Sequence, residues 1–133
     1  MRSGHGLITW NELNTWDPET AKAYYGAVFD WTFDELPTAG TDEPRPYYMI
    51  KKGDETVGGI FTMLEPMFSG NREHRITYIG VDDVEAAIRI SDAAGGKVTR
   101  PPFDIPNAGR LAIVHAKGGA YQVFFQALEA PTA

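Results

Sequence analysis

The sequence predicts an α+β fold of two paired βαβββ modules, with a mixed, curled sheet that forms a cup and with the helices outside. One helix signature occurs twice and aligns without a gap when Asp17 is set on Asp82. An apolar, strand-like segment precedes each copy, and the βαβα alternation of a doubly wound parallel sheet is absent. We therefore expect a single domain over residues 1–133, with module 1 at about 6–64 and module 2 at about 73–129.

Module 1 begins with an alternating strand at residues 6–14, which puts Trp10 and Glu12 on one face. A helix then begins at Asp17, whose carboxylate can cap the first turn, with a proline at the first helical position. The helix runs to about Phe29, and its helical spacing predicts one buried apolar stripe: Ala21, Tyr24, Tyr25, Val28 and Phe29.

Further strands complete module 1, at residues 31–36, 47–52 and 56–64. Gly58 and Gly59 lie inside the last of them and suggest a bulge or a close backbone approach. A polar linker at residues 65–73 separates the two modules.

Module 2 repeats the plan, with a strand at 75–81, a helix at 84–94, and strands at 97–100, 110–116 and 120–128. Gly95 or Gly96 can supply a left-handed end to the helix. The proline-rich segment 101–109 is predicted to be a stiff loop, and it could form a structured lid.

Composition excludes several classes of function. The net charge of −6 argues against nucleic acid or an anionic membrane as the main partner. The chain has no cysteine, which excludes disulfides, thiolate metal sites and a cysteine nucleophile, and which fits a cytoplasmic location. No apolar run is long enough for a membrane span.

Several motifs resemble one known superfamily. They are Trp10-Asn-Glu-Leu, Asp17-Pro-x-x-Ala-x-x-Tyr-Tyr-x-x-x-Phe-x-Trp31, Tyr78-Ile-Gly-Val-Asp-Asp83, Gly95-Gly-Lys-Val98, Pro102-Phe-Asp-Ile-Pro106, Gly109-Arg110 and Gly119-Ala120. Together they resemble the vicinal oxygen chelate superfamily, which holds glyoxalase I, bleomycin-resistance proteins and extradiol dioxygenases, and within it the actinobacterial glyoxalase-like domains. The resemblance implies paired βαβββ modules around a cup, and a fold that hosts several chemistries.

The resemblance also implies a divalent metal held by His, Glu or Gln from the first, fourth, fifth and eighth strands. In this chain three of the corresponding positions are Trp10, Ile76 and Val123, whose side chains cannot coordinate an ion. The fourth is one of residues 60–62, which carry neither a carboxylate nor an imidazole. A shift of two residues would bring in Glu12 and His74. We therefore expect no metal and no other cofactor.

The same positions instead make an apolar, aromatic cup, which is typical of a site for a small organic, possibly aromatic, molecule. The alternative is that these side chains are packed core. The predicted lining is Trp10, Phe61, Met63, Ile76, Tyr78, Tyr121, Val123 and Phe125, with Arg110 as a polar contributor.

Glu12 would be a carboxylate on the cup face, and a buried carboxylate could act as a general acid or base. The alternative is a solvated side chain, or one paired with Arg75 or Arg110. His74 and Arg75 could form a cationic rim, or simply a solvated strand end. Arg110 could likewise belong to a structural brace with Asp104.

Two functions follow from these residues. The first is a binding module that holds an organic molecule without a metal. The second is a small lyase, isomerase or dioxygenase that uses a metal or Glu12. Apolar residues left over from the predicted core also favour a homodimer; they are Trp16, Trp31, Phe33, Met67 and Phe68.

Overall fold

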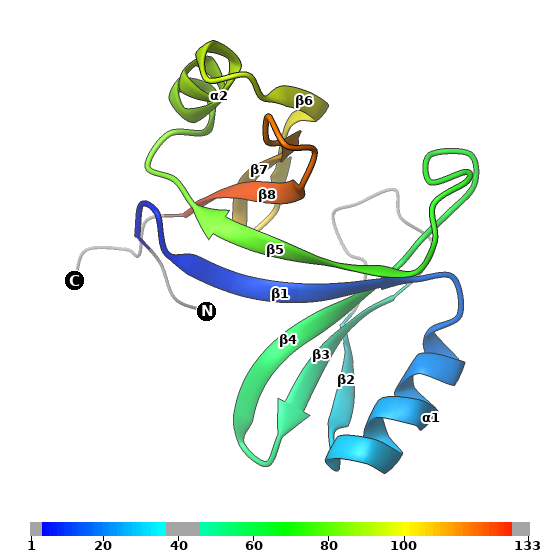
Figure 1. Ribbon diagram of the computed structural model, residues 1–133. Helices are drawn as coiled ribbons and strands as arrows, with labels where there is room; N and C mark the ends of the chain where they lie inside the picture. Colours follow the sequence, from blue (N-terminus) through cyan, green and yellow to red (C-terminus); the bar gives the residue numbers. More distant parts are fainter. Residues whose placement is uncertain (1–3, 37–45, 129–133) are drawn as a thin grey trace, which may run out of the picture. The chain divides into compact units, whose positions relative to one another are not determined.

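The computed structural model describes residues 4–36 and 46–128 of the chain. Its helices and strands follow in the order β1 (Ile8–Thr15), α1 (Pro18–Phe29), β2 (Thr32–Leu36), β3 (Tyr47–Lys52), β4 (Glu55–Thr62), β5 (His74–Gly80), α2 (Val84–Ala93), β6 (Lys97–Ile105), β7 (Gly109–His115) and β8 (Tyr121–Ala127) (Figure 1). The predicted βαβββ order, present twice, is confirmed. Neither helix among the described residues is long and apolar enough to cross a membrane.

Backbone contacts divide the chain into two compact units. Trp10–Ile76 form one of them, and the described residues from Thr77 onward form the other, together with the segment that ends at Thr9. Most of module 1 therefore lies in one unit and most of module 2 in the other.

Both modules have the same strand order. In module 1 it is β2-β3-β4-β1, and in module 2 it is β6-β7-β8-β5. The pairs β1/β4 and β5/β8 are parallel, and the other neighbours within each module are antiparallel. Each helix thus connects strands that are not neighbours, which confirms the predicted mixed sheet and excludes a doubly wound one.

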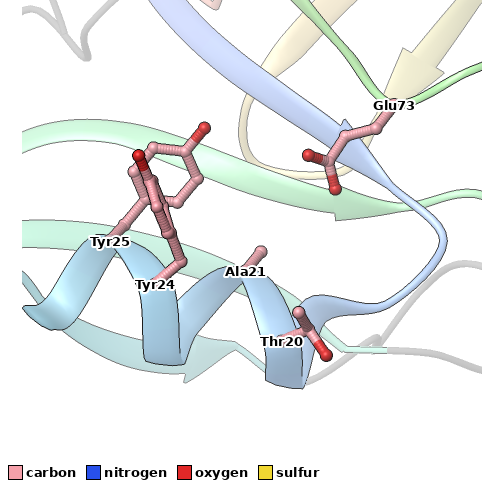
Figure 2. Close-up of a pocket in the computed structure, with 5 residues that line it drawn as sticks. All are labelled: Thr20, Ala21, Tyr24, Tyr25 and Glu73. Carbon is pink, nitrogen blue, oxygen red and sulfur yellow. The ribbon is translucent and has the colours of Figure 1, made fainter.

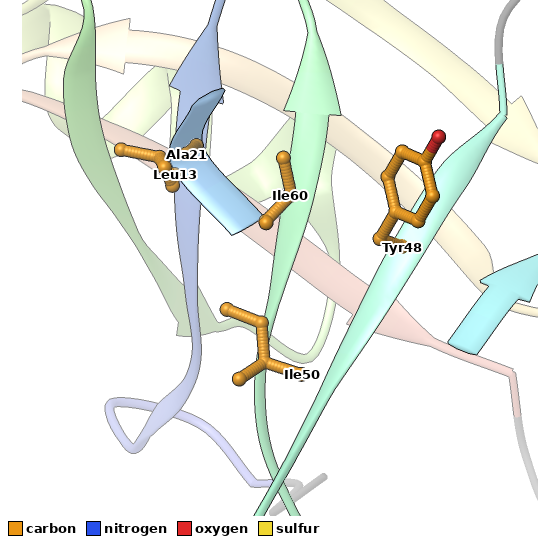
Figure 3. Packing of buried hydrophobic residues seen from close by; sticks show 5 residues of the cluster. All are labelled: Leu13, Ala21, Tyr48, Ile50 and Ile60. Atoms are coloured by element: carbon orange, nitrogen blue, oxygen red, sulfur yellow. The ribbon is translucent and has the colours of Figure 1, made fainter. Parts of the chain in front are cut away.

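Helix α1 forms where its capping residues predict it. The Asp17 carboxylate accepts hydrogen bonds from the backbone N–H of Thr20 at 3.1 Å and from its hydroxyl at 2.6 Å. Ala21 then packs on one face of the module 1 sheet. The resulting core is made of Leu13, Ala21, Tyr48, Ile50 and Ile60 (Figure 3).

The predicted apolar stripe of α1 is only partly buried. Ala21 is buried and Tyr25 packs against the core, but Tyr24 is 60% exposed, and Val28 and Phe29 are also exposed. The stripe is wider than the contact that one helix makes with the sheet, so its outer edge stays in solvent. Phe29 instead packs against Trp31 at a ring distance of 5.0 Å.

Helix α2 covers one face of the module 2 sheet in the same way. The side chain of Asp83 caps the helix by accepting a hydrogen bond from the backbone N–H of Ala86 at 3.0 Å. The buried core of this module consists of Val84, Ala112 and Val114. Gly95, with φ of +99°, supplies the left-handed backbone after the helix.

The prediction of a loop over residues 101–109 is wrong. Strand β6 continues through Pro101 and Pro102 to Ile105, and residues 106–108 turn into β7. Prolines are tolerated here because β6 lies at the end of the module 2 strand order. The backbone groups on one side of such a strand have no neighbouring strand to bond with, so a missing N–H costs little. The pairing of β6 with β7 shifts register on both sides of Arg100. The prolines therefore lie at an irregular part of the strand pair, where some backbone groups are unpaired in any case.

The linker packs back onto module 1. The Phe68 ring lies 5.5 Å from that of Phe61, and the Trp16 indole donates to the carbonyl of Asn71 at 2.8 Å. Trp31 stacks on Tyr25, and Phe33 packs against the α1 core. Much of the predicted partner surface is therefore occupied within the chain itself, although Met67 is 64% exposed.

Candidate functional site: a buried polar cluster on module 1

The candidate site lies on the face of the module 1 sheet opposite α1, which we call the inner face. Leu13, Tyr48 and Ile60 point toward α1, so their neighbours along each strand point the other way. Strand pairing puts Glu12 beside Gly59, and Gly59 beside Met49. By this alternation the inner face holds Trp10, Glu12, Asn14, Tyr47, Met49, Gly59 and Phe61.

Gly59 lets the side chain of Tyr47 cross strand β4. A Cβ atom at residue 59 would overlap the hydroxyl and ring of Tyr47. Gly58 also meets close backbone, since its Cβ would lie 2.6 Å from the carbonyl oxygen of Asn11. The close approach predicted for the two glycines is therefore confirmed, and it brings a residue of β3 to β1.

Three side chains meet where Tyr47 reaches β1. The indole Nε1–H of Trp10 donates to the Tyr47 hydroxyl at 2.9 Å. That hydroxyl is also hydrogen-bonded to the carboxylate of Glu12. Asn14 adds a bond from its Nδ2 to Oε2 of Glu12 at 3.3 Å. Trp10 and Glu12 are only 8% and 5% exposed, so this polar cluster is buried.

The surroundings strongly favour the neutral form of Tyr47. Burial raises the pKa of Tyr47 well above its ordinary value, and the negative charge and hydrogen bond of Glu12 raise it further. The bond from Trp10 acts in the opposite direction. Tyr47 is thus a proton donor in the cluster under all ordinary conditions.

Sequence reasoning missed Tyr47. Strand β3 was predicted at its true bounds, but no residue on it was assigned to the site. The available signal was the pair of glycines on the neighbouring strand, because a Gly in a strand often marks a place where another group comes close.

The other predicted site residues of this unit are also packed. Met63 and Ile76 are buried, and Phe61 is half-buried against Phe68. This burial agrees with the packed-core alternative as well as with a closed binding site, so their role in ligand binding stays a prediction.

Module 2 carries its predicted site residues on the sheet face opposite α2. Tyr78 pairs with Val123, and its ring lies 5.8 Å from that of Phe125. Tyr121 lies on the same strand face but is 57% exposed, with its ring against His115. These side chains form one aromatic strip within module 2.

Arg110 does not share that face. It alternates with Leu111 along β7 and lies on the α2 side, with Ala112 and Val114. Its guanidinium pairs with Glu85 of α2 at 2.6 Å and with Asp104 of β6 at 3.2 Å. The pKa of Glu85 is lowered, chiefly by its hydrogen bond to Arg110. These contacts match the brace that was the alternative to a ligand contact.

A second group of polar side chains lies on the α1 side of module 1. A pocket of about 390 Å³ is lined there by Thr20, Ala21, Tyr24, Tyr25 and Glu73 (Figure 2). Glu73 accepts a hydrogen bond from Thr15 at 2.5 Å. Arg75 stacks over the Tyr25 ring at 5.0 Å and donates to Asn11 at 3.1 Å, so it faces α1 rather than Glu12. We call this the outer pocket.

The metal positions implied by the family do not fit an ion. Trp10 donates its indole N–H within the cluster, and Ile76 and Val123 carry no ligand atom. Among residues 60–62 only Thr62 has a side-chain oxygen, a hydroxyl, and none has a carboxylate or an imidazole. Over residues 4–36 and 46–128, the structure gathers no group of three or more His, Cys, Asp or Glu side chains that could hold a metal. His74, the alternative ligand, instead contacts the carbonyl of Arg72 at 2.7 Å.

Comparison with known proteins identifies related sequences. The family described as the Glyoxalase/Bleomycin resistance protein/Dioxygenase superfamily matches residues 7–124. CFP32 of Mycobacterium tuberculosis is 38% identical over 115 residues, which cover 86% of this chain and 42% of that protein. The anthracycline biosynthesis protein DnrV of Streptomyces peucetius is 24% identical over 130 residues, or 90% of this chain and 46% of that protein. The chain therefore spans less than half the length of these curated relatives.

Solved structures agree at the level of the fold. Methylmalonyl-CoA epimerase from Mycobacterium tuberculosis superposes with a TM-score of 0.63 over 97% of this chain and 94% of the epimerase, at 12% sequence identity. Identity this low supports a shared fold and leaves the chemistry to the residues of the site itself.

Proposed function

The chain belongs to the Glyoxalase/Bleomycin resistance protein/Dioxygenase superfamily, and on that premise we propose that it binds a small organic, possibly aromatic, molecule at the inner face of module 1. Trp10 and Phe61 would supply aromatic contacts, and Glu12 would supply the polar one. The predicted residues of module 2 are proposed separately, as a ligand-binding surface of that module; they are Tyr78, Tyr121, Val123 and Phe125. Arg110 is left out because it is paired with Glu85 and Asp104.

The observation that supports this proposal is the burial of Glu12. A carboxylate among aromatic side chains costs free energy unless several groups hydrogen-bond to it. Here Tyr47 and Asn14 both do so, at a position where an apolar residue would pack without that cost. Residues kept against their effect on stability are typical of sites that bind or react.

An anthracycline is a suitable first probe, because the name of DnrV associates a relative with such compounds. Binding would be followed by quenching of tryptophan fluorescence. We expect Glu12→Gln and Trp10→Phe to weaken binding at least tenfold, and Glu73→Gln in the outer pocket to leave it unchanged. Loss of binding only in Glu73→Gln would place the ligand in the outer pocket and contradict the proposal.

We further propose that binding needs no metal or other cofactor. The donor set supports this, because the side chains at the family's ligand positions do not coordinate ions. Metal analysis of the purified protein should then find Fe, Ni, Zn and Mn well below one equivalent. A stoichiometric metal that survives dialysis would contradict this part of the proposal and favour the enzyme described next.

The second candidate is a small lyase, isomerase or dioxygenase that either depends on a metal or uses Glu12 as a general acid or base. Tyr47 and Asn14 both hydrogen-bond to Glu12 and hold its carboxyl group in place, as a general base requires. Such an enzyme should catalyse exchange of the acidic C–H protons of a ketone probe such as acetophenone with D₂O. Exchange that is lost in Glu12→Gln would support it, and no exchange above background would favour the binding module.

We also propose that the chain forms a homodimer and acts in the cytoplasm. Exposed apolar side chains such as Met67 and Tyr24 favour self-association. The lack of cysteine agrees with a reducing compartment. Nucleic acid and membrane surfaces are poor partners for a chain with a net charge of −6.

A further inference from the structure

The Tyr47 hydroxyl lies between the indole of Trp10 and the carboxyl group of Glu12, and the Trp10 bond fixes how the hydroxyl is used. An indole N–H donates and cannot accept, so the Tyr47 oxygen is the acceptor of the 2.9 Å bond from Trp10. A phenol has a single proton, which is then available for its other partner, Glu12. Donation from Tyr47 to Glu12 fits the direction in which this bond moves the pKa of Tyr47, which is upward.

Glu12 receives donors from two sides. Besides Tyr47, the Asn14 amide donates to Oε2 at 3.3 Å. An ionised carboxylate can accept on both oxygens, and both of these neighbours carry a proton that they can donate to it. Hydrogen bonds to an ionised acceptor are stronger than neutral ones, so the arrangement stabilises the carboxylate form.

The backbone fixes this arrangement. Glu12 and Asn14 are two residues apart on one strand and so share a face, and Gly59, the strand partner of Glu12, makes room for the Tyr47 ring. The same face carries Asp34 of β2 and Lys51 of β3, whose strands are separated from β1 by β4. Tyr47 thus reaches Glu12 across a strand that carries no side chain in its way.

We infer that Tyr47 is a positioning residue that holds Glu12 as an ionised hydrogen-bond acceptor, so that the site selects organic ligands that present a donor, such as a phenol or an amine, over ligands that present a carboxylate. The part of this inference that concerns ligand selection rests on the proposed binding function. The part that concerns the link between Tyr47 and Glu12 does not. Tyr47 acts through Glu12, and Glu12 makes the contact with the ligand.

The hydrogen-bond chain is tested without any ligand. We expect the ¹³C resonance of the Glu12 carboxyl carbon, assigned with Glu12→Gln, to have the position of an ionised group at neutral pH. In Tyr47→Phe the indole N–H resonance of Trp10 and the carboxyl resonance of Glu12 should both move. Tyr48→Phe is the matched control, because Tyr48 is the next residue on β3 and points toward α1. A protonated Glu12, or equal effects of the two variants, would overturn the inference.

Ligand selection is tested with two probes of the same shape, 4-methylphenol and 4-methylbenzoate. The wild-type protein should bind the phenol about tenfold more tightly or better, and Glu12→Gln should lose this preference. Equal or tighter binding of the benzoate would overturn the donor preference. Failure of both probes to bind would contradict binding at this face, while the resonances still decide whether Tyr47 and Glu12 are linked as described.

Discussion

At the scale of single residues, Gly59 determines what the inner face of module 1 can hold. Any larger residue there would collide with Tyr47, because the Tyr47 ring occupies the space of the missing side chain. Tyr47 in turn connects Trp10 with Glu12. One glycine therefore supports a polar cluster that involves three strands.

Gly59→Ala should be destabilising. The added methyl group must displace either Tyr47 or the β4 backbone, and overpacking of this kind costs about 1–3 kcal/mol. Urea unfolding measures the change. Gly118→Ala is the control, since a Cβ there meets no atom within 4 Å, and it should be nearly neutral. Combining Gly59→Ala with Tyr47→Ala should give less than the sum of the two single effects; full additivity would mean that the two residues do not meet.

The stability contributed by Tyr47 should depend on pH in the alkaline range. Its pKa in the folded protein is raised above the ordinary value of 10.0, so the unfolded chain loses this proton first as the pH rises. The contribution is complete below pH 10 and decreases as the pH rises above it. Urea unfolding should show that wild type loses stability relative to Tyr47→Phe over this range. A parallel response of the two proteins would contradict burial of the hydroxyl, and Tyr121→Phe, at an exposed site, serves as the control.

At the scale of elements, each helix is specified by its own cap and only partly by its apolar stripe. Asp17 and Asp83 cap α1 and α2 in the same way, because the side-chain oxygen of each accepts a hydrogen bond from the backbone N–H three residues later. The stripe of α1 is wider than its contact with the sheet, and Tyr24 and Val28 remain exposed. The cap locates the start of the helix, and packing on the sheet decides which side chains are buried.

Asp17→Ala should therefore cost about 1 kcal/mol of unfolding free energy, which is typical for loss of an N-cap. Asp17→Asn keeps an oxygen in the same position and should cost much less. Equal losses in the two variants would mean that the negative charge near the helix end matters more than the hydrogen bond. Urea unfolding at neutral pH separates the two cases.

At the scale of the whole molecule, the apolar residues that predicted a partner surface fall into two groups. Trp31, Phe33 and Phe68 pack within module 1. Met67 stays exposed, as does part of Trp16. The surface left for a partner is smaller than the sequence suggested, so self-association depends on fewer residues.

Sedimentation equilibrium at micromolar concentration should nevertheless give about twice the chain mass of 14.7 kDa. Met67→Glu should shift the equilibrium toward the monomer because it puts a charge into the proposed interface. Ile90→Glu alters a side chain that is equally exposed on α2 and should have no effect. A wild-type mass of 14.7 kDa would refute the dimer.

The sequence by itself determined the two modules and the positions of both helices, and it placed the strand ends to within two residues except at the end of β6. These depend on local signals, namely the Asp caps, the alternation that puts Trp10 and Glu12 on one face, and glycines at the turns. It also placed Glu12 on the inner face, because a period of two needs no knowledge of the neighbouring strands.

Only the tertiary structure decided which side chains meet. Tyr47 reaches Glu12 from another strand across Gly59, and no pattern within either strand specifies that contact. The pairing of Arg110 with Glu85, and the continuation of β6 through two prolines, likewise depend on which elements are neighbours and on β6 lying at the end of its module. Periodicity along a chain fixes the face on which a residue lies, whereas the partner it finds there depends on strand order and on the space that neighbouring residues leave.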